Sequence, residues 1–287
     1  MYTIVAASQK GGSGKTTLSG HLAVEASRAG AGEIALIDTD PQGSLAHWWN
    51  ARTAPEPRFV KAGLHNLDQA LAGLREMGIK IAVIDTPPAI TQSISQVVAH
   101  ADLVIVPTRP SPHDLRAVGA TVDIAERHGK PLIFVINAAT PRARITGESA
   151  VALSQHGMVA PITIHHRTDF AASMIDGRTV GEVVPDSQSA REITDLWRYI
   201  QERLSRIVHD PALLPDVKLG HLAINSLLSD APEAAGELIM PPVAETPIHE
   251  GPERRSGTER RLILEPRPHE RRIFGRRATD QVHWGHK

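Results

Sequence analysis

The chain has 287 residues, a formal net charge of -1 and no cysteine. Without cysteine there is no disulfide framework, no thiolate zinc site and no iron–sulfur cluster held by cysteine. The length allows one large domain, or one domain and a tail, and the neutral charge gives no support for nucleic-acid binding by bulk attraction. Apolar runs such as ADLVIV are far shorter than the roughly 20 residues of a membrane helix, and MYTIVAAS lacks the cationic start of a secretion signal, so we expect a soluble cytoplasmic protein.

Short aliphatic runs alternate with longer stretches of helical periodicity. The runs predict buried strands, which are apolar almost throughout, as is typical of parallel strands covered on both faces. These strands are predicted over 3–8, 33–38, 80–85, 102–107 and 131–137. Helices are predicted over 15–29, 65–77, 112–128 and 187–207. The alternation predicts an α/β fold, with a doubly wound, mostly parallel sheet and helices on both faces.

The segment SQKGGSGKTT, residues 8–17, joins the first predicted strand to the first predicted helix. Its glycines permit backbone angles closed to other residues, so the loop amides and the helix N-terminus can surround phosphate oxygens. Lys15 can bridge the β- and γ-phosphates, Thr16 can ligate Mg²⁺, and Thr17 can reach the α-phosphate. The nucleotide-binding residues predicted in this loop are Gly11, Gly12, Ser13, Gly14, Lys15, Thr16 and Thr17.

Two further predicted strands run into motifs that contain aspartate. DTDPQGS, residues 38–44, begins where the second strand ends, and VIDTPP, residues 83–88, spans the end of the third strand. A single aspartate at such a place more often caps a helix. Two of them behind a phosphate-binding loop are much stronger evidence for a nucleotide and metal site.

The loop departs from the ordinary pattern G-x-x-x-x-G-K-[ST], because Gln9 stands where glycine is required and Lys10 adds a second lysine. It matches the deviant Walker A form, K-G-G-x-G-K-[ST], and over about residues 2–207 the chain resembles the ParA branch of the ParA/MinD ATPases. The resemblance implies a P-loop NTPase fold, binding of ATP and Mg²⁺, and slow, partner-stimulated hydrolysis of ATP to ADP and phosphate. It also implies that Lys10 reaches across an ATP-dependent homodimer to the nucleotide of the other subunit.

The resemblance assigns roles to the remaining site residues. Asp40 would orient or activate the attacking water, so the implied catalytic residues are Lys10, Lys15 and Asp40. Asp85 would hold Mg²⁺ through water and Asp38 would support the metal, so the implied metal residues are Thr16, Asp38 and Asp85.

The segment INAAT, residues 136–140, also resembles ParA. Asn137 ends a predicted strand, and its amide either contacts the adenine edge or serves as a turn residue. Residues 165–183 resemble the segment that closes over the base in this family, although IHHR at 164–167 replaces the Ile-Pro-Arg of many relatives. His165 and His166 have no further ligand at metal spacing, so we interpret them as solvated or locally hydrogen-bonded.

The resemblance implies further partners. The ATP dimer would bind DNA without sequence preference and associate with the nucleoid, and a separate protein, ParB-like or a cargo adaptor, would stimulate hydrolysis. Any one of the candidate arginines is more often part of a solvated face, but a few on each subunit would suffice. The candidate DNA contacts are Arg142, Arg144, Arg167, Arg178, Arg191 and Arg198.

The composition changes after about Val208. We expect an ATPase domain over 1–208, a Pro/Ala/Glu-rich linker over 209–252 and an Arg-rich, disordered tail over 253–287, where apolar residues are too sparse for a core. Three roles stay open for the tail: a solubilising extension, added phosphate contacts, or binding to an anionic membrane. The membrane role ranks last, because RRIFGRR offers only two apolar residues.

Three functions of different classes therefore remain. The first is an ATPase that partitions DNA or positions another cargo, and DTDPQ favours it because that motif resembles the ParA branch. The second is a MinD-like regulator that cycles on and off a membrane. The third is a metabolic or metal-insertion enzyme on the same fold, and the lack of cysteine argues against its iron–sulfur members.

Overall fold

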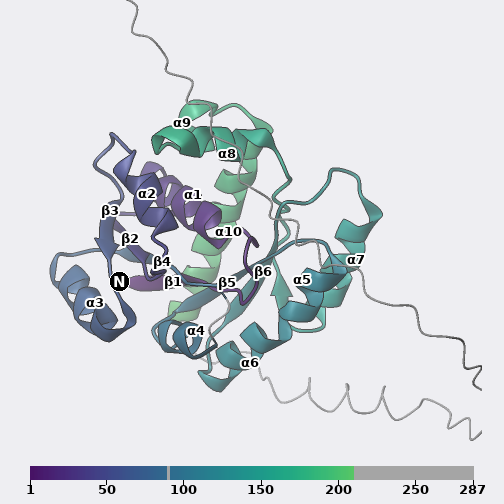
Figure 1. Ribbon diagram of the computed structural model, residues 1–287, viewed down its shortest axis with the longest axis horizontal. Coiled ribbons are helices and arrows are strands. Elements are labelled where there is room, and N and C mark those ends of the chain that lie inside the picture. Colours follow the sequence, from purple (N-terminus) through teal and green to yellow (C-terminus); the bar gives the residue numbers. More distant parts are fainter. Residues whose placement is uncertain (89–90, 210–287) are drawn as a thin grey trace, which may run out of the picture. The chain divides into compact units, whose positions relative to one another are not determined.

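A parallel sheet forms the centre of the protein in the computed structural model, which describes residues 1–88 and 91–209 (Figure 1). Within those residues the sheet has seven strands in the order β3-β2-β4-β1-β5-β6-β7. The strands are β1 (Tyr2–Ala6), β2 (Ile34–Asp38), β3 (Arg58–Lys61), β4 (Ile81–Asp85), β5 (Leu103–Thr108), β6 (Leu132–Ile136) and β7 (Met158–Val159). The five predicted strands are confirmed, and the sequence interpretation missed the short β3 and β7 at the two edges.

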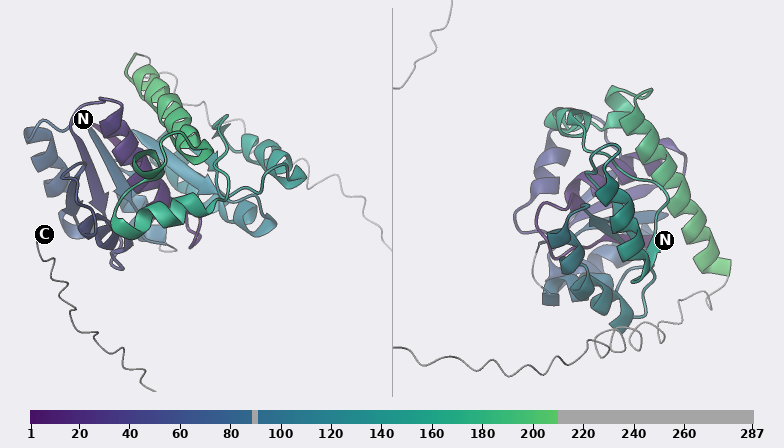
Figure 2. Two further views of the ribbon diagram at one scale, coloured as in Figure 1. Left: turned by 90° about the horizontal axis from the view of Figure 1, so that it is seen from above. Right: turned by 90° about the vertical axis from the view of Figure 1, so that its right-hand side faces the viewer.

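Helices cover both faces of the sheet, as predicted. Alternate strand residues point to opposite faces, so Ile4 belongs to the core beneath α1 and α10 while Val5 belongs to the core beneath α3, α4 and α6. The helices are α1 (Lys15–Arg28), α2 (Ser44–Asn50), α3 (Leu67–Glu76), α4 (Thr91–Val98), α5 (Pro112–Ala117), α6 (Gly119–Arg127), α7 (Arg144–Ser154), α8 (Thr168–Ser173), α9 (Val180–Val183) and α10 (Gln188–His209). Figure 2 shows α10 alongside the sheet from two further directions.

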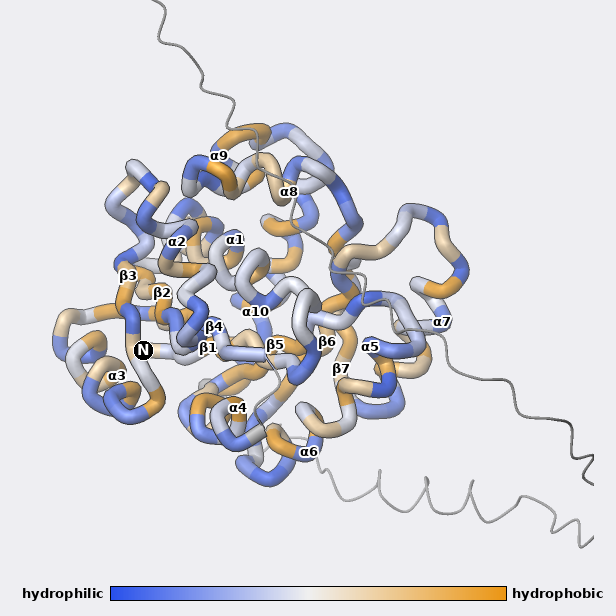
Figure 3. Tube along the Cα trace, viewed as in Figure 1, coloured by the Kyte–Doolittle hydropathy of each residue, from blue (hydrophilic) through white to orange (hydrophobic). Residues whose placement is uncertain are grey.

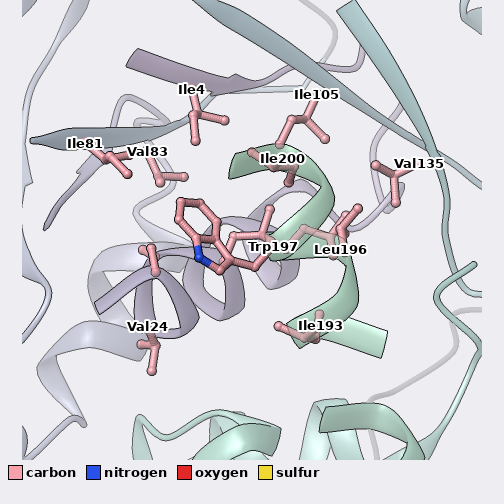
Figure 4. Close-up of a cluster of buried hydrophobic side chains, with 14 of the residues drawn as sticks. Ile4, Val24, Ile81, Val83, Ile105, Val135, Ile193, Leu196, Trp197 and Ile200 are labelled. Carbon is pink, nitrogen blue, oxygen red and sulfur yellow. The ribbon is translucent and has the colours of Figure 1, made fainter. Parts of the chain in front are cut away.

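The core follows the predicted apolar stripes. Along α3, hydrophobic and hydrophilic residues alternate (Figure 3), and Leu67, Leu71 and Leu74 are at most 2% exposed. On α10 the predicted stripe is buried against the strands, with Trp197 at its centre (Figure 4). Burial of these stripes fixes both helices on the sheet, because apolar side chains removed from water provide most of the stabilisation.

The helix predicted over 112–128 is two helices. Its start is confirmed, since the Ser111 hydroxyl accepts a hydrogen bond from the Asp114 amide and Pro112 occupies the first turn. The helix is interrupted at Val118, and α6 begins at Gly119, a residue with poor helix propensity. The sequence interpretation also missed α2, α4, α7, α8 and α9.

Trp197 provides a test of the core. It is 1% exposed, and we expect Trp197→Ala to lower the free energy of unfolding by about 3–5 kcal/mol, because it leaves a cavity at the centre of α10. Denaturant unfolding measures this change. The control is Arg198→Ala on the same helix, whose side chain is 64% exposed and whose loss should cost less than about 0.5 kcal/mol. Equal effects of the two substitutions would contradict this placement of α10.

Candidate nucleotide-binding site

The carboxyl ends of three neighbouring strands meet at one edge of the sheet. In the parallel register, Asp85 at the end of β4 lies opposite Asp38 of β2 on one side and Ala6 of β1 on the other. Two threonine hydroxyls join the strands just beyond this point: Thr39 donates to the Asp85 carbonyl at 2.6 Å and Thr86 donates to the Ala6 carbonyl at 2.8 Å. All three predicted motifs therefore converge, because each follows one of these strands.

The glycine loop between β1 and α1 has a conformation that other residues cannot adopt. Gly14 has φ 97° at the N-cap of α1, and a Cβ added there would lie 2.1 Å from Nδ2 of Asn137. That Nδ2 donates a 2.7 Å hydrogen bond to the carbonyl of Ser13. Asn137, directly after β6, thus stabilises the loop through this hydrogen bond, a role that the sequence interpretation missed. Its predicted adenine contact stays a prediction.

A cavity of about 460 Å³ lies over this loop. Lys15 is 6% exposed, and its Nζ lies 3.5 Å from the Lys10 carbonyl. Burial lowers the pKa of Lys15 from its ordinary value, because removal from water disfavours the charged amine. The cavity is lined by Gly11, Gly12, Gly14, Lys15, Thr16, Thr17, Asp40, Gln42, Ser44, Thr86, Pro88 and Arg109.

The residues around Asp85 fit a magnesium ion. Oδ2 of Asp85 accepts a 2.6 Å hydrogen bond from the Thr16 hydroxyl, while its Oδ1 is buried and has no hydrogen-bond partner among the described residues. Burial raises the pKa of Asp85 to about 7. A buried carboxylate with one unsatisfied oxygen next to a hydroxyl provides the oxygen ligands that Mg²⁺ prefers. The described residues contain no cluster of three or more His, Cys, Asp or Glu side chains that could hold a metal, so water and phosphate oxygens would complete the coordination.

Asp38 and Asp40 occupy different environments in the turn between β2 and α2. Both carboxylate oxygens of Asp38 accept backbone hydrogen bonds, from the amides of Asp40 at 2.9 Å and Ala46 at 3.0 Å. Asp38 therefore shapes the turn. Asp40 lines the cavity, and its Oδ1 accepts a hydrogen bond from the amide of Gln42. The predicted role of Asp40 in positioning water stays a prediction.

Lys10 forms an ion pair within its own chain. Its Nζ lies 2.6 Å from Oδ2 of Asp114 in α5, and the Ser111 hydroxyl donates to the same carboxylate. Asp114 is 5% exposed, whereas the Lys10 side chain is 36% exposed. The predicted reach of Lys10 to another subunit stays a prediction, and it requires the lysine to leave a buried carboxylate.

Two contacts that the sequence interpretation missed connect the nucleotide loops to residues 176–183. Arg52, just after α2, is 4% exposed and binds Glu182 through two hydrogen bonds of 2.6 and 2.9 Å and the Gly177 carbonyl through a third of 2.9 Å. On α1, the His21 ring contacts the Thr17 carbonyl through Nδ1, and its Nε2 accepts from the Val180 amide at 3.2 Å. Residues far apart in the sequence are thus held against α1 and α2.

The segment predicted to close over the base is anchored by α10. Glu192 of α10 is 5% exposed and accepts hydrogen bonds from the His165 amide at 3.0 Å and from Arg167 at 2.7 Å, and it contacts Nδ1 of His165 at 2.7 Å. His166 is exposed. The interpretation of these two histidines as locally hydrogen-bonded or solvated is confirmed.

The candidate DNA-binding arginines differ in how they are compensated. Four of them form ion pairs: Arg144 with Glu148, Arg167 with Glu192, Arg178 with Asp176, and Arg198 with Asp195. Arg142 and Arg191 are exposed, and neither forms an ion pair with a carboxylate of the described residues. No helix within residues 1–88 and 91–209 combines the length and apolar character that crossing a membrane requires. The predicted linker, 209–252, and tail, 253–287, lie outside the described residues except for residue 209, the last residue of α10.

A doubly wound parallel sheet whose central strand ends in a lysine-containing glycine loop defines a P-loop nucleotide-binding protein. The chain belongs to the CobQ/CobB/MinD/ParA nucleotide binding domain family, which matches residues 4–180. The predicted membership is confirmed.

Individual relatives agree with this assignment. The chain is 28% identical over 200 residues to Maintenance of carboxysome distribution protein A of Halothiobacillus neapolitanus, an alignment that covers 67% of this chain and 92% of the relative. It is 30% identical over 133 residues to Protein ParA of Rhizobium radiobacter, covering 42% of this chain and 53% of the relative.

Solved structures share the fold. The cell division ATPase MinD of Pyrococcus furiosus aligns with a TM-score of 0.60 at 16% identity, covering 70% of this chain and 99% of MinD. A McdA–ATP complex from Cyanothece aligns with a TM-score of 0.57 at 18% identity, covering 71% of this chain and 96% of McdA. The predicted fold class, a doubly wound sheet of the ParA/MinD type, is therefore confirmed.

His21 gives the site a testable pH dependence. Burial lowers its pKa to about 4 from 6.5, so between these values the unfolded chain binds a proton that the folded chain does not. The free energy of unfolding should therefore fall as the pH drops from 6.5 to 4, and His21 should account for up to about 3 kcal/mol of this decrease. Above pH 6.5, His21 should make no contribution to the pH dependence.

Urea unfolding of His21→Gln between pH 4 and 8 measures this contribution. The variant should lose this part of the pH dependence, while His166→Gln, at an exposed position, should keep it. If the curves of the wild-type protein and His21→Gln ran parallel, His21 would not be buried as a neutral ring.

Proposed function

We propose that the protein is a ParA-like ATPase that dimerises with ATP, binds DNA without sequence preference and hydrolyses ATP to position a cargo. The observation that carries this proposal is the arrangement of the cavity: the loop of a deviant Walker A motif forms its floor, and Asp40 lines its wall. Two solved structures of the same fold are complexes with ATP and with Mg-ADP, which supports the choice of nucleotide.

The proposed reaction is attack of water on the γ-phosphorus, which releases ADP and phosphate. Asp40 orients the water and accepts a hydrogen bond from it, while Lys15 and the loop amides stabilise charge on the phosphate oxygens. Thr16, Asp85 and Asp38 would hold or support Mg²⁺, which supplies charge neutralisation of the phosphates when it is bound. The protein contributes positioning and electrostatic stabilisation, and no covalent intermediate is needed.

Dimerisation would exchange one partner of Lys10 for another. In the single chain its ammonium pairs with Asp114, and in the proposed dimer it contacts phosphates bound to the other subunit. Leaving a buried carboxylate is costly unless a stronger anion replaces it. A triphosphate has an additional charged phosphate, the γ-phosphate, that a diphosphate lacks. ATP would therefore stabilise the dimer more than ADP does.

The names of relatives suggest a cargo. Two of them are called Maintenance of carboxysome distribution protein A and two others Protein ParA and Protein IncC. The carboxysome-named relative from Halothiobacillus neapolitanus aligns over 92% of its length, which favours a protein body as cargo over plasmid DNA. A separate adaptor on that cargo would stimulate hydrolysis, and the nucleoid would be the surface along which the ATP dimer moves. Binding to a membrane would require the tail outside the described residues, and no described contact supports it.

Lys10 and Asp40 should separate dimerisation from hydrolysis. We expect Lys10→Ala to bind ATP but remain monomeric, because the charge that joins the subunits is lost. We expect Asp40→Ala to form an ATP dimer that hydrolyses ATP about 10²–10⁴-fold more slowly, because the group that positions water is lost. Size-exclusion chromatography with light scattering and a phosphate-release assay measure both. Lys80→Ala, at an exposed lysine outside the cavity, serves as the control. Normal ATP-dependent dimerisation of Lys10→Ala would contradict the proposed role of Lys10.

DNA binding should depend on the nucleotide. We expect the full chain to bind random duplex DNA with ATP and not with ADP, with a log–log salt slope of about -3.6 if roughly four phosphates are neutralised. Fluorescence anisotropy measures the affinity. The double variant Arg142→Gln/Arg191→Gln should weaken binding, and Arg127→Gln, an exposed arginine on α6, should not. Binding that ignored the nucleotide and vanished on removal of residues 209–287 would show that the tail contacts DNA and that nucleotide control is wrong.

A further inference from the structure

One cationic side chain in the cavity has no role in the account above. Arg109 follows β5 in the connection to α5 and lines the cavity together with the glycine loop. Its Nη2 lies 3.8 Å from the place that a Cβ on Gly12 would occupy. The guanidinium thus lies close to the glycine loop, and it follows a strand other than those that precede the three recognised motifs.

Arg109 lacks the carboxylate partner that other cationic side chains of the site have among the described residues. The ammonium of Lys10, in the same part of the molecule, pairs with Asp114, and buried Arg52 pairs with Glu182. Arg109 is exposed, and within the part of the chain that the structure describes it forms no ion pair with a carboxylate. An uncompensated guanidinium on the wall of a cavity whose floor is built for phosphate is placed to bind an anion.

The loop residue that Arg109 lies beside, Gly12, indicates which phosphate the guanidinium reaches. Thr17, at the start of α1, is assigned to the α-phosphate, and Lys15 to the β- and γ-phosphates. Gly12 lies farther from α1 along the loop than Lys15 and Thr17, so we infer that it borders the γ-phosphate end of the nucleotide. Asp40, assigned to the attacking water at that end, lines the same cavity.

We propose that Arg109 binds the γ-phosphate of the nucleotide held in its own subunit and thereby favours ATP over ADP. This proposal rests on the proposed function, since it presumes that the cavity holds a nucleotide. A guanidinium can donate two parallel hydrogen bonds to phosphate oxygens, which a lysine cannot, and it keeps its charge at any accessible pH. In the proposed dimer, Lys15 and Arg109 of one subunit and Lys10 of the partner subunit would then surround the terminal phosphates.

The test compares the affinities of Arg109→Gln for a non-hydrolysable ATP analogue and for ADP, by fluorescence titration of labelled nucleotides. We expect affinity for the ATP analogue to fall about tenfold and affinity for ADP to change less than about threefold. The matched control is Arg116→Gln. Arg116 is an exposed arginine of α5 in the same connection, but it does not line the cavity, and its loss should leave both affinities unchanged.

Two further variants make the outcomes distinct. Lys15→Ala should abolish binding of both nucleotides; if it bound them normally, the proposed nucleotide function itself would fail, whatever Arg109 did. In a Lys10→Ala background, the loss of affinity caused by Arg109→Gln should persist, because the contact is within one subunit. Equal losses for ATP and ADP, no loss for either, or a loss that disappears in the Lys10→Ala background would each overturn the proposal.

Discussion

The register of three parallel strands determines where the three motifs of the candidate nucleotide site lie. The last residues of β2, β4 and β1 lie side by side, so the loops that follow these strands start next to one another. These residues are Asp38, Asp85 and Ala6. Parallel pairing allows this because all carboxyl ends share one edge, and the helices on both faces keep that edge open. A slip of one residue in β4 would turn Asp85 to the other face and bury its carboxylate in the apolar core.

Charge balance within the site depends on the same geometry. The carboxylates of Asp38 and Asp85 are removed from water, and burial raises both pKa values, because it disfavours their charged forms. Burial lowers the pKa of Lys15 for the same reason. A magnesium ion would stabilise the charged aspartates and the phosphates of a nucleotide would stabilise charged Lys15, which explains in physical terms why the two are expected to bind together.

Much of this arrangement was predictable from local patterns, and the rest was not. Apolar runs and the stripe of α10 predicted the central strands and the helix that covers them, because burial on both faces leaves a continuous signal in the sequence. Edge strands such as β7, with two residues, leave too short a signal. The loop glycines and Asp85 were predictable because each lies in a compact motif. Three contacts in the site could not be predicted, because each joins residues at least 97 positions apart that only the folded sheet brings together. They are the contacts of Asn137 with the loop at Gly14, of Asp114 with Lys10, and of Arg109 with Gly12.

The hydrogen bonds of Arg52 join two parts of the chain that are far apart in the sequence. Arg52 lies one short helix beyond Asp40, and its buried guanidinium holds Gly177 and Glu182 through three hydrogen bonds. Stretching those bonds without water to replace them costs more than a joint shift of both parts. If the proposed hydrolysis displaces the Asp40 turn, Arg52 would transmit that displacement to α9. A partner protein bound to the outer surface of α8 and α9 would then respond to the nucleotide without contacting it.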